Sequence, residues 1–125
     1  DGVQVELASC TLNPEKQFVY TFEFSDARRR ALRSVRVEDV SDAAAFLLLE
    51  DPKPVVPAGG RWRGESRPLA ASEPCLSWIA TISNTLRVFR FTLTFADGRT
   101  LTLHQGSLYP AGSKVALRQA LGMKY

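Results

Sequence analysis

The chain has 125 residues, of which 45% are hydrophobic, and a formal net charge of +3 at pH 7. This length is enough for one domain with a single core, and the composition is ordinary for a globular protein. No apolar run approaches the roughly 18 residues that a membrane-spanning helix needs. The sequence shows no internal repeat and no low-complexity segment. We therefore expect one domain over residues 1–125, without a transmembrane segment.

The first third of the chain alternates between apolar and polar residues, which is typical of strands with one buried face. Residues 3–8 (VQVELA) form the first such segment, and residues 13–15 (NPE) mark a turn. Residues 18–24 (FVYTFEF) then place their aromatic side chains on one face, and residues 25–26 end the segment. The pattern predicts two strands joined by a turn.

The middle of the chain is less regular. Residues 32–40 (LRSVRVEDV) are predicted as a third strand, with Val35 and Val37 facing inward. Residues 43–50 (AAAFLLLE) fit either a buried strand or a short helical turn, and the apolar run favours the strand. Residues 52–74 contain five of the seven prolines and a glycine pair, which predicts a loop or an irregular edge.

The clearest pattern is a hairpin over residues 88–104. Its Asp-Gly dipeptide suggests a two-residue loop, but that loop would pair apolar with polar residues. A three-residue loop, Ala96–Gly98, aligns both faces and puts Gly98 in the left-handed position of a G1 bulge. The expected pairs are Phe91 with Leu103, Leu93 with Leu101, Thr92 with Thr102, Thr94 with Thr100, and Arg90 with His104.

The polar face of this hairpin carries threonines, Arg90 and His104. Facing threonines stabilise paired strands by roughly 0.2–1 kcal/mol per pair and need no ligand to explain them. Arg90 opposite His104 speaks against a surface tuned for ion pairs, so we interpret this face as solvated scaffold. An uncovered regular strand is, however, also a template on which another strand can pair.

Two shorter elements are predicted around and after this hairpin. Residues 76–82 are expected to form a short strand whose Trp78 belongs to the core. Ser113 is suited to cap a short helix over residues 114–121, which Gly122 would end. Two helical turns are marginal alone, so we expect this helix to pack against the sheets.

Six to eight strands joined by turns predict an all-β protein, an antiparallel β-sandwich with a short C-terminal helix. The architecture resembles an immunoglobulin-like fold. The resemblance does not extend to the antibody spacing, in which a tryptophan lies between two cysteines, because Trp78 follows Cys75 here. It therefore implies an architecture and no particular family.

Cys10 and Cys75 are the two cysteines of the chain. An even number of cysteines in a protein of extended strands is compatible with a disulfide, and the alternative is two separate buried thiols. A disulfide would close a loop of about 66 residues and stabilise the fold by up to ~4 kcal/mol in the chain-entropy model. We favour the disulfide, and with it a periplasmic or extracellular location.

Patterns of catalysis and cofactor binding are absent from the sequence. His104 is the single histidine, and no phosphate loop, nucleophile elbow or HExxH motif occurs. Glu38, Asp39 and Asp42 cluster near a strand end but lack the ligand spacing of a calcium loop. We interpret them as solvated turn carboxylates and expect a protein that is not an enzyme and holds no metal or cofactor.

Arginine supplies the main functional indication, since it outnumbers lysine twelve to four. Arginine clusters suit an acidic partner surface, an anionic envelope polymer or nucleic acid. Nucleic acid is disfavoured because exposed aromatic residues are not interleaved with the basic ones. The alternative is a solvated hairpin tip without function. The candidate binding residues are Arg28, Arg29, Arg30 and Arg33 in one turn, and Arg61, Trp62, Arg63 and Arg67 in the segment rich in proline and glycine.

Trp62 has two interpretations. Between two arginines in a loop, it would be a binding hot spot; alternatively it folds back and covers one end of the sandwich. We expect a non-catalytic secreted or cell-envelope interaction module that acts by protein–protein contact with an unknown partner, one with an acidic surface. The alternative is a module for a small ligand or carbohydrate, held by the Arg/Trp loop at 61–67.

Overall fold

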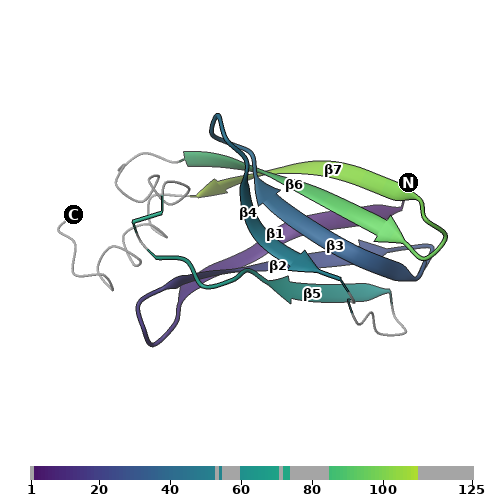
Figure 1. Ribbon diagram of the computed structural model, residues 1–125, viewed down its shortest axis with the longest axis horizontal. Helices are drawn as coiled ribbons and strands as arrows, with labels where there is room; N and C mark the ends of the chain where they lie inside the picture. Colours follow the sequence, from purple (N-terminus) through teal and green to yellow (C-terminus); the bar gives the residue numbers. More distant parts are fainter. Residues whose placement is uncertain (1, 53, 55–59, 71, 74–84, 110–125) are drawn as a thin grey trace.

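Two antiparallel sheets packed face to face form the protein, as the computed structural model shows (Figure 1). The structure describes residues 2–52, 54, 60–70, 72–73 and 85–109. One sheet has the strand order β1-β2-β5 and the other β4-β3-β6-β7. The predicted all-β antiparallel sandwich is thereby confirmed. Within the described residues the strands are β1 (Val3–Leu12), β2 (Phe18–Asp26), β3 (Leu32–Asp39), β4 (Phe46–Asp51), β5 (Arg61–Glu65), β6 (Thr85–Phe95) and β7 (Thr100–Tyr109).

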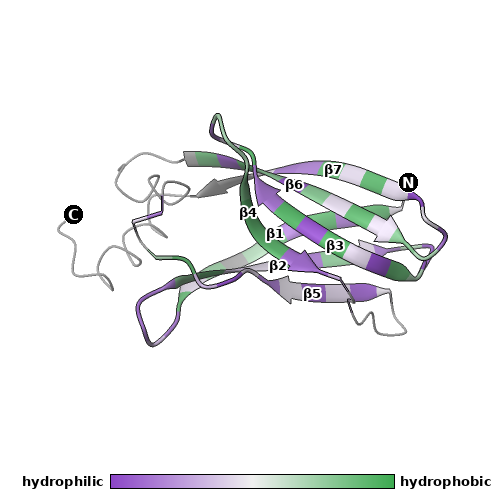
Figure 2. Ribbon diagram, in the orientation of Figure 1, coloured by the Kyte–Doolittle hydropathy of each residue, from purple (hydrophilic) through white to green (hydrophobic). Residues whose placement is uncertain are grey.

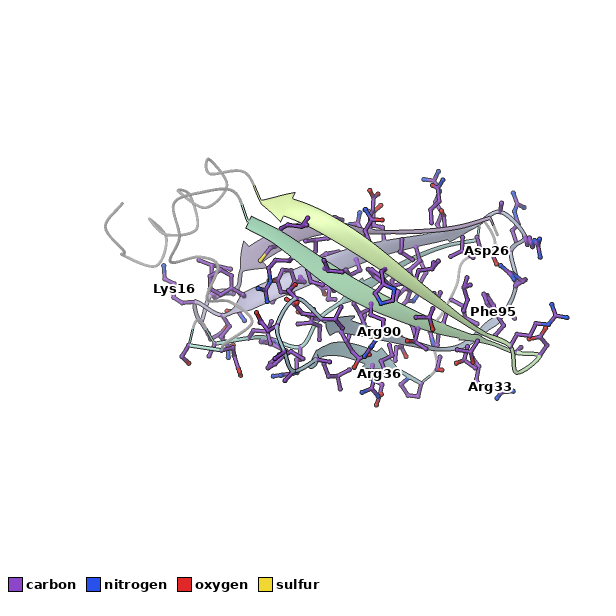
Figure 3. The ribbon with its side chains drawn as sticks, turned by 90° about the horizontal axis from the view of Figure 1, so that it is seen from above. Lys16, Asp26, Arg33, Arg36, Arg90 and Phe95 are labelled. Carbon is purple, nitrogen blue, oxygen red and sulfur yellow. The ribbon has the colours of Figure 1, made fainter. Side chains whose placement is uncertain are left out.

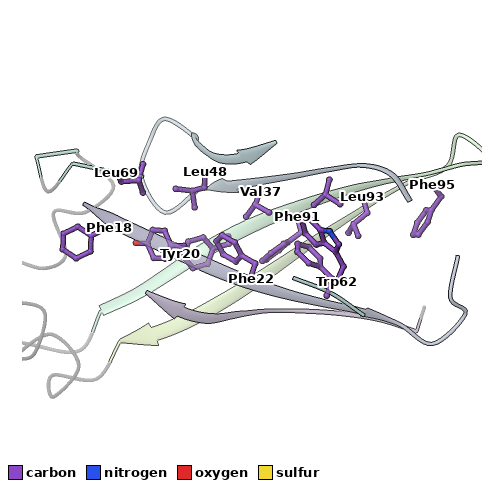
Figure 4. Close-up of a cluster of buried hydrophobic side chains, with 13 residues drawn as sticks. Phe18, Tyr20, Phe22, Val37, Leu48, Trp62, Leu69, Phe91, Leu93 and Phe95 are labelled. Atoms are coloured by element: carbon purple, nitrogen blue, oxygen red, sulfur yellow. The ribbon is translucent and has the colours of Figure 1, made fainter. Parts of the chain in front are cut away.

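The core lies between β2 and β6, the central strands that carry the alternating aromatic residues. Figure 2 shows this alternation as bands along β6 and β7. Tyr20 and Phe22 of β2 meet Phe89 of β6 edge to face, at centroid distances of 5.7 and 5.4 Å, and Phe22 meets Phe91 at 5.5 Å (Figure 4). Such geometry adds to the burial of the rings. The fully buried aromatic side chains of these two strands are Phe18, Tyr20, Phe22, Phe89 and Phe91.

The hairpin register predicted from the sequence is confirmed at every pair from Arg90–His104 to Thr94–Thr100. The loop holds three residues: Phe95 N donates to Arg99 O at 2.8 Å, and Gly98 N donates to Phe95 O at 2.9 Å. Gly98 has φ +92°, the left-handed conformation that glycine adopts without a steric cost. The face alternation of the strands therefore fixed the loop length.

The loop expected at 61–67 is wrong, because this segment contains a strand; of the two alternatives for residues 52–74, the sheet edge is the one found here. Residues 61–65 form β5, an edge strand that pairs with β2 through Phe24–Trp62 and Phe22–Gly64. Trp62 is 8% exposed and packs on Phe24 with a centroid distance of 4.4 Å. The Trp62 side chain therefore folds back over the core and is not an exposed binding hot spot.

Gly64 makes room for that tryptophan. Both residues face the core from the same strand, so the indole ring of Trp62 lies over residue 64. A Cβ on residue 64 would overlap the ring and lie 2.9 Å from Cδ2 of Leu49 on β4. The short run Trp62–Arg63–Gly64 thus closes the side of the sandwich between β5 and β4.

Asp39 and Arg87 form an ion pair on the core side of the second sheet. Their side chains are 1% and 6% exposed, and Arg87 Nη2 donates to Asp39 Oδ2 at 2.8 Å and to Asp42 Oδ2 at 3.0 Å. Burial alone would lower the pKa of Arg87, but hydrogen bonds to Asp42 and Asp39 and their charges raise it above its ordinary value. This pair ties the end of β3 to the start of β6.

The outer face of the same sheet also carries ion pairs, contrary to the expectation of a face without them. Glu38 accepts two hydrogen bonds from Arg90, at 3.0 and 3.1 Å, and lies 3.6 Å from Arg36. Arg36 in turn donates to Glu50 at 2.8 Å. The interpretation of Glu38 and Asp39 as solvated turn carboxylates is therefore wrong, because each is less than a tenth exposed and bound to arginine.

Some predicted features lie outside the described residues. These are Cys75, the strand at 76–82 with Trp78, and the helix at 114–121. Cys10 lies half-buried on β1, where it pairs with Tyr20. The Cys10–Cys75 disulfide therefore stays a prediction.

The Trp62–Gly64 contact predicts that Gly64→Ala destabilises the protein by roughly 1–3 kcal/mol, because the added methyl forces a buried ring to move. Urea unfolding of the variant measures this. Gly106→Ala is a matched control, since its Cβ would meet only the exposed Leu86 side chain, at 3.1 Å. In a Trp62→Leu background the cost of Gly64→Ala should shrink; an equal cost in both backgrounds would contradict the contact.

The buried ion pair predicts a large loss of stability for Asp39→Ala, roughly 3–5 kcal/mol, because Arg87 keeps its charge in the core with one of its two acceptors removed. Asp42→Ala removes a partner that is 50% exposed and should cost about 1 kcal/mol or less. Thermal and urea unfolding compare the two variants. Equal losses would show that the buried position of Asp39 does not matter.

Candidate functional site

Most of the predicted binding residues lie at one end of the sandwich. Arg28, Arg29 and Arg30 are in the turn between β2 and β3, and Arg33 is near the start of β3. Figure 3 shows Asp26, Arg33 and Phe95 together at this end and Lys16 at the opposite end. We call the end that carries the β2–β3 turn the basic end.

Asp26 organises the turn. Its carboxylate accepts hydrogen bonds from the backbone N–H groups of Arg28 and Arg30, and from Nε of Arg30, all at 3.0 Å. Burial alone would raise the pKa of Asp26, but the hydrogen bonds from Arg30 and Arg28 and the charge of Arg30 hold it below its usual value. Asp26 was missed as a site residue, although an aspartate that follows a strand and precedes a turn is a known signal for this capping.

Among the predicted residues, Arg30, Arg33 and Arg67 have side chains that are held by contacts within the fold. Arg30 pairs with Asp26 and lies 4.2 Å over the ring of Phe95. Arg33 donates to Ala96 O at 3.2 Å and so joins the two neighbouring turns. Arg67 lies 4.8 Å over the Phe46 ring and donates to Leu47 O. Like the buried Trp62, these three arginines contact other parts of the fold and so stabilise it.

Arg29 and Arg61 converge from the two predicted clusters. Asp26 N donates to Gly60 O at 3.0 Å and so joins the end of β2 to the start of β5. Gly60 has φ +73°, and a Cβ there would lie 3.0 Å from Cγ of Arg29. Because Gly60 has no side chain, Arg29 can lie against the backbone just before β5. Both arginines line one hollow of about 460 Å³ at the basic end.

A larger hollow of about 790 Å³ adjoins this one and shares Arg61 with it. Its lining comes from β1, β2, β5 and β7, and it includes Arg63 and His104. Arg63 is paired with Glu23. In the larger hollow the charge of Arg63 is therefore neutralised by Glu23. The smaller hollow contains Arg29 and Arg61.

The charge balance of the basic end is positive. Within the described part of the chain, neither Arg29 nor Arg61 makes an ion pair, and both side chains are exposed. Asp26, which also lines the smaller hollow, is already bound by Arg30. Two guanidinium groups on one hollow can bind carboxylate or phosphate oxygens by charge-assisted hydrogen bonds.

Other chemistry has less support in the described residues. Over those positions, no group of three His, Cys, Asp or Glu side chains could hold a metal ion. His104 is exposed on β7 opposite Arg90. In the same part of the chain, no helix is long and apolar enough to span a membrane.

Comparisons with known proteins return no relative of this chain. No protein-family model matches it, and neither a curated protein nor a solved structure does so.

The turn predicts a pH-dependent contribution to stability from Asp26. Because its pKa is lowered in the folded state, ionised Asp26 stabilises the fold above about pH 4, the unfolded value, and this contribution is lost as pH falls through the folded pKa. Wild type should exceed Asp26→Asn by on the order of 1–3 kcal/mol near pH 7 and converge with it in acid. Urea unfolding across pH tests this, with Asp97→Asn as a control for charge. A difference that is constant with pH would contradict it.

Proposed function

We propose that the chain is a non-catalytic interaction module of the secreted or cell-envelope kind, which binds an acidic protein surface through its basic end. The observation that carries the proposal is the convergence of Arg29 and Arg61, from separate segments, on one hollow. Arg28, which precedes Arg29 in the same turn, also has an exposed side chain. An acidic partner would supply the carboxylates that these side chains bind best.

The strand order supports an immunoglobulin-like type for this module. In such sandwiches the first, second and fifth strands share one sheet, and the third, sixth and seventh share the other. The chain has this division, with β4 beside β3 in the second sheet. In variable-type domains a strand after the third also lies at that position.

The extracytoplasmic setting rests on the two cysteines, Cys10 and Cys75, for which we propose a disulfide. Small domains built this way commonly present their turns to partners. The basic end is formed by such a turn together with the start of β5.

The second candidate is a small anionic ligand or a carbohydrate at 61–67. The hollow of about 790 Å³ favours it, since its size suits a small molecule. The burial of Trp62 weighs against a carbohydrate, because a ring that is 8% exposed offers little surface for a sugar to stack on. We therefore rank protein contact first.

Charge reversal tests the proposal. Arg29→Glu and Arg61→Glu should each reduce partner capture from envelope extract by roughly tenfold or more, because each replaces attraction by repulsion. Capture by the wild type should also fall as salt rises. Lys16→Glu, an equal change of charge at the opposite end, should capture normally, and melting temperatures check that all variants fold. Capture that survives both arginine changes would refute the basic end as the site.

A further inference from the structure

The described strands leave four sheet edges, formed by β1, β5, β4 and β7. An edge strand exposes backbone N–H and C=O groups on which another chain can pair, and proteins commonly interrupt such edges with bulges, charges, proline or short strands. The four edges of this protein differ in how they are protected.

Three of the edges carry such interruptions. β1 has a bulge between Leu7 and Ser9. β5 is five residues long and carries charges at 61, 63 and 65. β4 has a bulge at Leu48, and its carbonyls at Leu47 and Leu48 accept hydrogen bonds from the side chain and the backbone of Arg67.

The edge of β7 has none of these features. It pairs with β6 over ten consecutive residues without a register shift. Its sequence, TLTLHQGSLY, contains no proline, Asp, Glu, Lys or Arg. Among the described strands, β6 is its one hydrogen-bonded neighbour. The large hollow is lined by Leu103 and His104 of β7 and by Val3–Glu6 of β1, a strand of the other sheet that lies near β7 without pairing with it.

The register identifies the backbone groups that point away from β6. Phe95 N donates to Arg99 O, so the pairs that exchange hydrogen bonds recur every second residue, at Leu93–Leu101 and Phe91–Leu103. The residues between them direct their N–H and C=O groups to the open edge. These residues are Thr100, Thr102 and His104.

We propose that β7 pairs with β7 of a second copy of this chain, antiparallel about a two-fold axis at Thr102. In that register Thr102 faces its own counterpart, Thr100 faces His104 and Leu101 faces Leu103. The residues whose backbone groups point outward would exchange the hydrogen bonds, as an antiparallel ladder requires. The contact is isologous, the kind that closes a dimer.

The side chains of β7 complement themselves in this register. On the outer face, threonine meets threonine, a favourable cross-strand pair. On the inner face, Leu101 and Leu103, both half-buried in the single chain, would cover one another. No like charges oppose each other over 100–104, so the occupant that this strand fits is another β7. The proposal does not depend on Arg29 or Arg61.

Sedimentation velocity tests the proposal with the purified chain over a range of concentrations. Wild type should show a species of twice the 13.8 kDa chain mass that dissociates on dilution. Thr102→Pro removes one outward N–H without breaking a bond to β6 and should weaken association by roughly tenfold or more. Thr92→Lys, which places a charge on the adjoining face, should associate as wild type does.

A second variant keeps the test decisive if Thr102→Pro does not fold. Across the two-fold axis, the Cα atoms of the paired residues would lie about 5.5 Å apart, within disulfide reach. Thr102→Cys should therefore yield a covalent dimer on oxidation, whereas Thr100→Cys, which faces His104, should not; wild type controls for Cys10 and Cys75.

Four results would overturn the proposal. They are a wild type that stays monomeric at every concentration, a dimer unaffected by Thr102→Pro, equal cross-linking at 100 and 102, and a monomer that binds an extended Thr/Leu peptide instead of its own copy.

Discussion

The edge-to-face packing of aromatic rings between β2 and β6 is the interaction on which the rest of the fold depends. Phe22 lies between Phe89 and Phe91, and it therefore fixes how far each central strand is shifted along the other. Every other described strand pairs with β2, with β6 or with the neighbour of one of them. This contact fixes how the two sheets lie on one another, while the register within each sheet follows from the alternation of faces along its paired strands.

Arginine has two separate uses in this protein. Some guanidinium groups bind within the fold: Arg87 in the interior, Arg90 on the outer face and Arg30 against Phe95. Each of these three arginines forms an ion pair with a carboxylate, so together the pairs add no net charge. Arg29 and Arg61 have no carboxylate partner among the described residues, and they contribute positive charge to the basic end. The proposed binding surface is thus built on Arg29 and Arg61, for which the described residues supply no ion pair.

The sequence predicted the parts of the fold that depend on local alternation. The faces of β2 and β6, the three-residue loop and the position of Gly98 all follow from periodicity and turn chemistry, and each is confirmed. The β5 strand was missed because it is short and follows a segment rich in proline and glycine. Its pairing with Phe24 depends on contacts distant in sequence, which periodicity does not report.

The candidate site was predictable in composition but not in geometry. The arginine clusters could be read from the chain, yet the residues that serve the fold could not be separated from those that face solvent. Arg30 and Arg67 lie on aromatic rings far away in sequence, and the partners of Asp39 are visible only when β3 and β6 are paired. Arg29 and Arg61 line one hollow, and a Cβ at Gly60 would crowd Arg29 there; this arrangement appears only in three dimensions.

The fit of Trp62 over Gly64 has a consequence for how this sequence can change through evolution. A larger residue at 64 is compatible with the fold only where residue 62 has become smaller, so neither position is free to vary alone. Natural variants should therefore show the two sites substituting as a pair, with Leu49 as a third, weaker member. In an ancestor with a smaller side chain at 62, glycine must have replaced residue 64 before tryptophan could arise at 62.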